Sequence, residues 1–146
     1  MSATVYCSSA MNDLEIFIDG ASKGNPGPSG IGVAIYSGGK VIRELSSFIG
    51  EATNNIAEYT ALIYALEEAM IMRPQRILIK TDSQLLYRQI KKIYKVKHPN
   101  MIGLYDRAVR LIGAFKEVEF ANIPREENSL ADKLATQAVK EARAKG

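Results

Sequence analysis

The stretch IFIDGASKGNPGPSGIGVAIY, which runs from Ile16 to Tyr36, decides how the chain begins to fold. Its first three residues are apolar and predict a strand that enters a hydrophobic core, and a second apolar strand starts near Gly30 after a glycine-rich loop. Asp19 places a carboxylate at the end of the first strand, where water is partly excluded. Because a buried carboxylate is costly unless a cation meets it, the stretch raises the question of what meets Asp19.

Outward from this stretch, the periodicity of apolar residues predicts an α/β fold. Strands are expected at residues 14–19, 30–37, 40–49, 76–81 and 115–122, and helices at 53–72, 83–93, 100–113 and 126–144. The segment SGGK at 37–40 predicts a hairpin turn, and the later strand–helix–strand units predict parallel pairing by right-handed crossovers. The expected architecture is a mixed five-stranded sheet, with three antiparallel strands followed by two parallel ones, flanked by helices.

Composition limits the kind of protein. The chain has 146 residues, which is the size of one domain, and its pI of about 9.0 with a net charge of +3 favours a polyanionic partner. A single cysteine, Cys7, excludes an internal disulfide and is typical of a reducing cytoplasm. The longest apolar stretch, 59–72, is broken by Glu67 and Glu68, so we expect no membrane span. A monomer is the default expectation.

The N-terminal region is expected to stand apart from the domain. Residues 1–12 are interpreted as a flexible tail and 13–146 as a single domain, with the alternative that translation starts at Met11. The first ten residues lack the basic start and long apolar segment of a signal peptide.

Four acidic residues stand where a site could form, and each also has an ordinary structural explanation. Asp19 precedes Gly20 and suits a turn. Glu58, early in the first helix, suits a solvated carboxylate near the positive end of the helix dipole. Asp82 suits a helix N-cap, and Asp132 suits a surface carboxylate beside the buried stripe of the last helix.

Taken together, the four acids favour a metal site. If the first and fourth strands are neighbours, Asp19 and Asp82 end side by side, and the first and last helices bring Glu58 and Asp132 from either side. Converging carboxylates repel one another, and hard divalent cations with oxygen ligands remove that conflict. Two Mg²⁺ ions, roughly 3.5–4 Å apart, can activate a water and stabilise the leaving oxygen of a phosphodiester. We expect Mg²⁺, with Mn²⁺ as a substitute.

Four motifs in this order resemble type 1 ribonuclease H. They are DGASKGNPGPSGIG (19–32), TNNIAEYTAL (53–62), TDSQ (81–84) and IPREENSLADKLA (123–135), and the resemblance covers roughly residues 14–139. It implies a ribonuclease H-like fold and endonucleolytic hydrolysis of the RNA strand of an RNA/DNA hybrid, leaving 5′-phosphate and 3′-hydroxyl ends. By motif match, Asp19 bridges two metal ions, Glu58 and Asp82 complete the ion nearer the attacking water, and Asp132 holds the second ion. The resemblance thus answers the opening question with Mg²⁺.

The resemblance also implies contacts with the hybrid. Thr53, at a helix start, is expected at a DNA phosphate, although an ordinary N-cap explains it as well. Asn55 is expected to contact 2′-hydroxyls or base edges, which distinguish RNA from DNA. The other residues expected along the minor groove are Gly20, Ser22, Asn25, Asn54 and Gln84.

A basic segment, KKIYKVKH at 91–98, suits a phosphate backbone, with a solvated helix end as the alternative. Lys91, Lys92 and Lys95 are its candidate contacts. Many family members carry a longer basic protrusion here, so this chain is expected to bind hybrids more weakly or with more dependence on salt.

The loop before the last acid departs from the family pattern. Some members place a histidine there, whereas this chain has IPREEN, and its only histidine, His98, is expected in another surface connection. We expect Arg125 to contact the scissile phosphate or to assist departure of the leaving group electrostatically, with an ion pair to Glu126 or Glu127 as the alternative.

Other functions stay open at this point. The substrate range extends to double-stranded RNA if the 2′-hydroxyl contacts suffice. The chain could instead be a catalytically silent hybrid-binding module, or a nuclease domain of a polyprotein or polymerase. The complete set of acids and motifs favours an active, standalone ribonuclease H.

Overall fold

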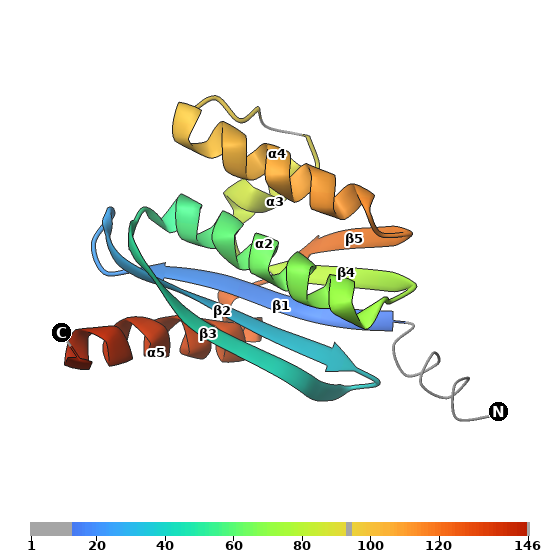
Figure 1. The fold of residues 1–146 in the computed structure, drawn as a ribbon, viewed down its shortest axis with the longest axis horizontal. Coiled ribbons are helices and arrows are strands. Elements are labelled where there is room, and N and C mark those ends of the chain that lie inside the picture. Colours follow the sequence, from blue (N-terminus) through green and yellow to red (C-terminus); the bar gives the residue numbers. More distant parts are fainter. Residues whose placement is uncertain (1–12, 93–94, 146) are drawn as a thin grey trace.

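The computed structural model describes residues 13–92 and 95–145 (Figure 1). The tail expected at 1–12 therefore lies outside the described residues. Five strands form one sheet in the order β3-β2-β1-β4-β5. The strands are β1 (Asp13–Ser22), β2 (Gly27–Ser37), β3 (Lys40–Ala52), β4 (Arg76–Thr81) and β5 (Glu117–Asn122). The first three pair antiparallel, whereas β4 pairs parallel with both β1 and β5, as predicted.

Helices cover both faces of the sheet. They are α2 (Asn54–Met72), α3 (Gln84–Ile90), α4 (Pro99–Gly113) and α5 (Ser129–Lys145), with a short 3₁₀ turn η1 (Arg125–Glu127). Along β2, Ile31 and Val33 belong to the core under α2, whereas the alternate residues Gly30 and Gly32 face α5. Since successive strand residues point to opposite faces, α2 and α5 lie on opposite sides of the sheet. In Figure 1, α4 lies on the outer side of α2.

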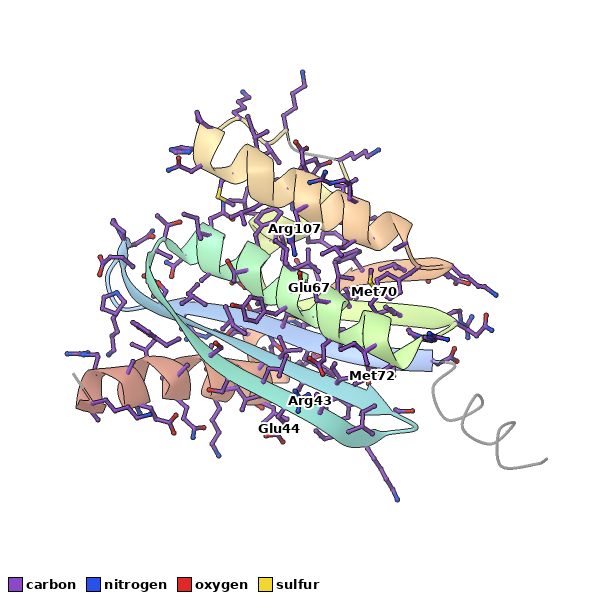
Figure 2. All side chains as sticks on the ribbon, in the orientation of Figure 1. Arg43, Glu44, Glu67, Met70, Met72 and Arg107 are labelled. Atoms are coloured by element: carbon purple, nitrogen blue, oxygen red, sulfur yellow. The ribbon has the colours of Figure 1, made fainter. Side chains whose placement is uncertain are left out.

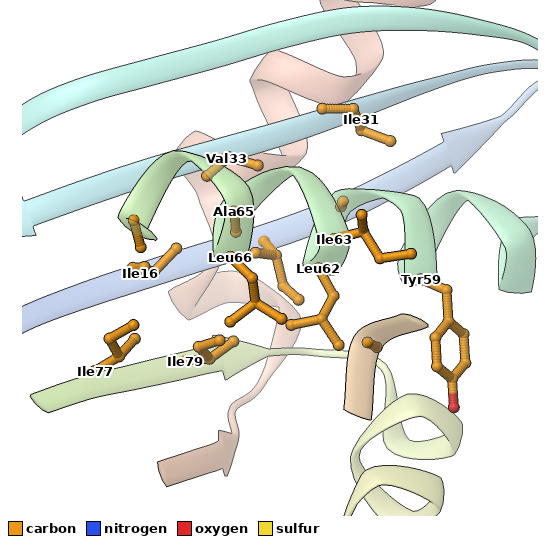
Figure 3. Close-up of a cluster of buried hydrophobic side chains, with 14 of the residues drawn as sticks. Ile16, Ile31, Val33, Tyr59, Leu62, Ile63, Ala65, Leu66, Ile77 and Ile79 are labelled. Atoms are coloured by element: carbon orange, nitrogen blue, oxygen red, sulfur yellow. The ribbon is translucent and has the colours of Figure 1, made fainter. Parts of the chain in front are cut away.

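The core is the interface between α2 and the sheet. Ile16 of β1, Ile79 of β4 and Leu62 and Leu66 of α2 are fully buried and lie together in Figure 3. Burying one such aliphatic side chain stabilises the fold by roughly 1.5–3 kcal/mol. The core therefore fixes where the first turn of α2 lies relative to the end of β1.

Local sequence signals set the ends of α2. Thr53 caps the N-terminus, because its hydroxyl accepts a hydrogen bond from the Ile56 N–H at 3.2 Å. Arg73 ends the helix in a left-handed conformation, with φ of 51°, and Pro74 follows. Ion pairs on the outer surface of α2 join it to its neighbours: Arg107 of α4 points toward Glu67 (Figure 2), and Arg43 of β3 pairs with Glu68 at 2.9 Å.

Several predicted element ends were wrong. The strand predicted at 30–37 begins at Gly27, because the first strand runs on to Ser22 and keeps pairing with it through the supposed loop. The helix predicted to reach residue 93 ends at Ile90, and Lys92 turns the chain with φ of 64°. The helix predicted from residue 126 begins at Ser129, after η1. The exposed loop between β1 and β2 is consequently short, at residues 23–26. Within the described ranges, no helix is long and apolar enough to cross a membrane.

Candidate active site

Asp19 and Asp82 lie side by side because of the strand register. Ile18 of β1 pairs with Thr81 of β4 in parallel, so the next residue along each strand is an acid. The turn after β4 is held by Thr81, whose hydroxyl accepts from the Ser83 N–H at 3.0 Å, and Ser83 in turn caps α3. The prediction that these two carboxylates would lie next to each other is confirmed.

Glu58 reaches the same place because α2 lies very close to β1. A Cβ atom built on Gly20 would lie 2.6 Å from the Ala57 carbonyl carbon and 2.7 Å from the Glu58 nitrogen. Glycine at 20 is therefore required for the helix to approach, which gives this residue a structural role besides the substrate contact predicted for it. One carboxylate oxygen of Glu58, Oε1, is buried and has no hydrogen-bond partner within the described part of the chain.

Three acids form a compact cluster that fits a divalent cation. One oxygen from each of Asp19, Glu58 and Asp82 lies within 4.8 Å of the other two. An all-oxygen donor set suits Mg²⁺ or another hard cation, and the unpartnered Oε1 of Glu58 is the kind of atom that such an ion would satisfy. The residues present therefore fit a metal centre.

Asp132 borders this cluster. It lies in the first turn of α5, its side chain is 36% exposed, and it is near enough to raise the pKa of Asp19. The structure thus brings all four predicted acids to one edge of the sheet, but only three of them within ligand distance of one another.

Crowding of carboxylates changes their protonation. Burial, then the charge of Asp82, then Asp132 raise the pKa of Asp19 from 3.8 to about 8. Burial, then the charges of Asp19 and Asp82 raise the pKa of Glu58 well above its usual value. Burial also raises the pKa of Asp82, although the hydrogen bond from Asn128 and the charge of Arg125 oppose that shift. Without a cation, the cluster therefore retains protons at neutral pH.

The metal-free protein should become less stable as the pH rises. Between about pH 4 and about pH 8, folded Asp19 keeps a proton that the unfolded chain has released, so the free energy of unfolding falls across this interval. A divalent cation binds the ionised carboxylates, so its stabilising effect should grow with pH. Thermal denaturation at about pH 5 and about pH 8.5, in Mg²⁺ or in EDTA, measures both effects. An equal Mg²⁺-induced rise in melting temperature at both pH values would contradict this coupling.

Asn128 was missed in the sequence reasoning. This residue follows η1 and is 1% exposed, and its side-chain nitrogen donates to the Ile18 carbonyl at 2.8 Å and to Asp82 Oδ2 at 3.1 Å. The available signal was its position four residues before Asp132, at the start of a helix, where asparagine is a preferred cap. That signal predicts a cap but not a contact with Asp82 across the sheet edge.

Arg125 lies beside the acids rather than in the alternative ion pair. Its guanidinium is 3.9 Å from Asp132 Oδ1, and its side chain is 81% exposed. The charge of Arg125 also lowers the pKa of Asp82. The Arg125 guanidinium is thus largely exposed next to Asp132.

A pocket beside the first turn of α2 collects several predicted nucleic-acid contacts. It has a volume of about 320 Å³ and is lined by Asn25, Thr53 and Asn55, together with His98 and Asn100 from the start of α4. Asn25 Oδ1 accepts from the Asn54 N–H at 3.0 Å, which fastens the β1–β2 loop to α2. His98 is exposed in the connection before α4, as expected, and it also caps α4 beside this pocket.

The remaining predicted contacts lie at the surface outside this pocket. Ser22 donates its hydroxyl proton to the Gly24 and Ala52 carbonyls and so braces the loop. The others are exposed at the start of α3 and after its end: Gln84, Lys91, Lys92 and Lys95. Their contact with a nucleic acid stays a prediction.

Comparison with known proteins identifies relatives of this chain. Residues 17–138 match the family described as "Reverse transcriptase-like". The bifunctional protein Rv2228c of Mycobacterium tuberculosis is 38% identical over 83% of this chain and 34% of its own length. Ribonuclease HI of Halobacterium salinarum is 39% identical over 88% of this chain and 65% of its own length. Ribonuclease H of Syntrophotalea carbinolica is 34% identical over 90% of this chain and 94% of its own length. This chain thus spans about a third of the first relative and nearly all of the last.

Solved structures agree with these matches. The crystal structure of RNase H1 from Halobacterium salinarum superposes with a TM-score of 0.86 at 37% identity, covering 89% of this chain and 99% of that chain. LC11-RNase H1 in complex with an RNA/DNA hybrid gives a TM-score of 0.85 at 38% identity, covering 88% and 98%. Since the family match spans most of the chain and relatives of similar length exceed 30% identity, this chain belongs to the ribonuclease H family.

Proposed function

We propose that this protein is an endoribonuclease that hydrolyses the RNA strand of RNA/DNA hybrids and uses two divalent ions to leave 5′-phosphate and 3′-hydroxyl ends. The observation that carries the proposal is the cluster of Asp19, Glu58 and Asp82, with a buried Glu58 oxygen that lacks a partner among the described residues. The kinship with ribonucleases H and the similarity to a family member solved with a hybrid support the substrate. We infer a monomer in the cytoplasm.

The acids are proposed to hold the metal, and the surrounding residues to hold the substrate. Asp19, Glu58 and Asp82 would bind one Mg²⁺ or Mn²⁺ ion, and Asp132 with Asp19 a second. The bound ions supply Lewis-acid activation of water and of the phosphodiester. The pocket beside Thr53 would take a phosphate of the DNA strand, because the positive end of the α2 dipole favours an anion there.

We assign discrimination between RNA and DNA to Asn55, which lines the same pocket. Asn55 has a buried side-chain oxygen without a partner within the described ranges, and this oxygen could accept a hydrogen bond from a 2′-hydroxyl. Since double-stranded RNA presents the same hydroxyls, its cleavage is a second activity that the assay must test.

The test uses end-labelled RNA/DNA hybrid, double-stranded RNA and double-stranded DNA, each with Mg²⁺, Mn²⁺ or EDTA. We expect metal-dependent cutting of the RNA strand of the hybrid and its loss in Asp82→Asn. Tight hybrid binding without cutting in either metal would overturn the proposal in favour of a silent binding module. Lack of cutting in the double-stranded RNA lane would restrict the substrate to hybrids.

Arg125→Ala is expected to lower kcat on the hybrid roughly tenfold while KM changes less than about twofold. The reason is that an arginine at the open side of the acid cluster would stabilise charge that develops on the phosphate during the reaction. Steady-state kinetics on the hybrid measures the effect. Arg110→Ala, which removes an exposed arginine from α4, is the matched control and should react like the unaltered protein. A wild-type kcat in Arg125→Ala would exclude a role in the chemical step.

A further inference from the structure

Asn128 joins three of the four segments that carry the acids at the open edge of the sheet. Its Nδ2 atom donates one hydrogen bond to the Ile18 carbonyl, directly before Asp19, and another to Asp82 Oδ2. Its backbone carbonyl accepts from the Asp132 N–H at 3.1 Å, and its own N–H donates to the Arg125 carbonyl at 2.9 Å. One residue thus contacts β1, the end of β4 and the first turn of α5.

The chemistry of the amide suits this place. An amide NH₂ has two protons, and both are used here on acceptors, so Nδ2 rather than Oδ1 must face Ile18 and Asp82. The bond occupies one oxygen of Asp82 and leaves the other for the interior of the cluster. A lysine at this place would add a competing cation, and an ionised aspartate would repel Asp82 and donate no proton.

The arrangement also leaves one polar atom of the Asn128 side chain without a partner among the described residues. Asn128 Oδ1 is buried and has no hydrogen-bond partner in the part of the chain that the structure describes. Such an unsatisfied oxygen costs on the order of 1–3 kcal/mol.

We propose that Asn128 is a positioning residue that fixes the Asp82 carboxylate in the orientation in which it binds the metal. This inference rests on the proposed metal-dependent function. Groups that orient a ligand from outside the first coordination sphere typically change metal affinity or activity by about 10–100-fold. Asn128 has the geometry of such a group, because it is held on its other side by the backbone of β1.

The experiment measures metal binding in the absence of substrate. Mn²⁺ is titrated into the free protein, and the unbound ion is quantified by electron paramagnetic resonance. We expect Asn128→Ala to bind Mn²⁺ about tenfold more weakly and to lower kcat on the hybrid by about 10–100-fold, with KM within about twofold of the original. If the alanine variant does not fold, Asn128→Ser is used, which keeps one donor and both backbone bonds, and at least threefold weaker binding is expected.

Ser46→Ala is the matched control. Ser46 on β3 donates to the Leu134 carbonyl at 2.6 Å, so this change also removes a side-chain hydrogen bond that holds α5, without touching the acids. We expect a lowered melting temperature with unchanged Mn²⁺ affinity. Wild-type Mn²⁺ affinity in the folded Asn128 variant would overturn the positioning role. Unaltered protein that binds Mn²⁺ but does not cleave would instead contradict the proposed function alone.

Discussion

Asp19→Asn is expected to lower the rate of hybrid cleavage by about 1,000-fold or more and, at the same time, to raise the melting temperature of the metal-free protein. Activity falls because Asp19 belongs to the cluster with Glu58 and Asp82 and also lies near Asp132. Stability rises because the amide cannot ionise and so removes repulsion from Asp82 and Asp132. The two effects have opposite signs, so loss of folding cannot explain the loss of activity.

The pH dependence sharpens this prediction. The pKa of Asp19 is raised to about 8, so the original protein loses stability between about pH 4 and about pH 8, where the unfolded chain has already released its proton. The stability advantage of Asp19→Asn should therefore grow between about pH 5 and about pH 8.5 in EDTA by up to about 4 kcal/mol, since each pH unit below the raised pKa contributes about 1.4 kcal/mol. Urea denaturation at the two pH values measures the advantage.

Asp13→Asn is the matched control for this change. Asp13 begins the same strand, is exposed, and pairs with Arg76 at 3.3 Å, far from the acid cluster. We expect its activity and the pH profile of its stability to equal those of the original chain. A lower melting temperature for metal-free Asp19→Asn at about pH 8.5 would show that the carboxylates do not repel one another as described.

Gly32→Ala is expected to destabilise the fold by about 2–4 kcal/mol and to impair cleavage in the molecules that remain folded. Gly32 pairs with Asp19 across β1 and β2 and lies under α5. A Cβ atom there would lie 2.1 Å from the Ala131 carbonyl oxygen and 2.7 Å from the Ala135 nitrogen, both of them backbone atoms. The helix would have to move away from the sheet and carry Asp132 away from Asp19.

Gly103→Ala tests whether the effect arises from this close approach. Gly103 lies in α4, and a Cβ atom there has open space around it. This change should stabilise the helix by about 0.5–1 kcal/mol and leave cleavage unchanged. Chemical denaturation and single-turnover kinetics compare the two variants. Equal free energies of unfolding for Gly32→Ala and the original chain would contradict the packing described for α5.

The sheet was predictable because its signals are local. Apolar runs, the SGGK turn and the caps of α2 depend on residues close in sequence. From them, the succession of strands and helices and the antiparallel and parallel pairings were predicted correctly. Element ends were less predictable, because they depend on partners: β2 extends to Gly27 only because β1 runs to Ser22 opposite it.

The acids of the site were predictable from strand ends and from motifs, whereas their supports were not. The residues adjacent to Gly20 and Gly32 in the sequence do not indicate that a helix packs against each glycine. The atoms that an added Cβ would contact belong to α2 at Gly20 and to α5 at Gly32. Asn128 was missed for the same reason, because its partners, Ile18 and Asp82, lie far away in the sequence.

The bond from Asn128 to Ile18 joins residues 110 positions apart, and the acids themselves come from both the first strand and the last helix. During synthesis on the ribosome, a nascent chain that already has its sheet and α2 would still lack Asp132 and the donor to Asp82. Nuclease activity should therefore appear only when the segment that forms α5 has left the ribosome exit tunnel, so that a half-made protein is harmless to the RNA around it.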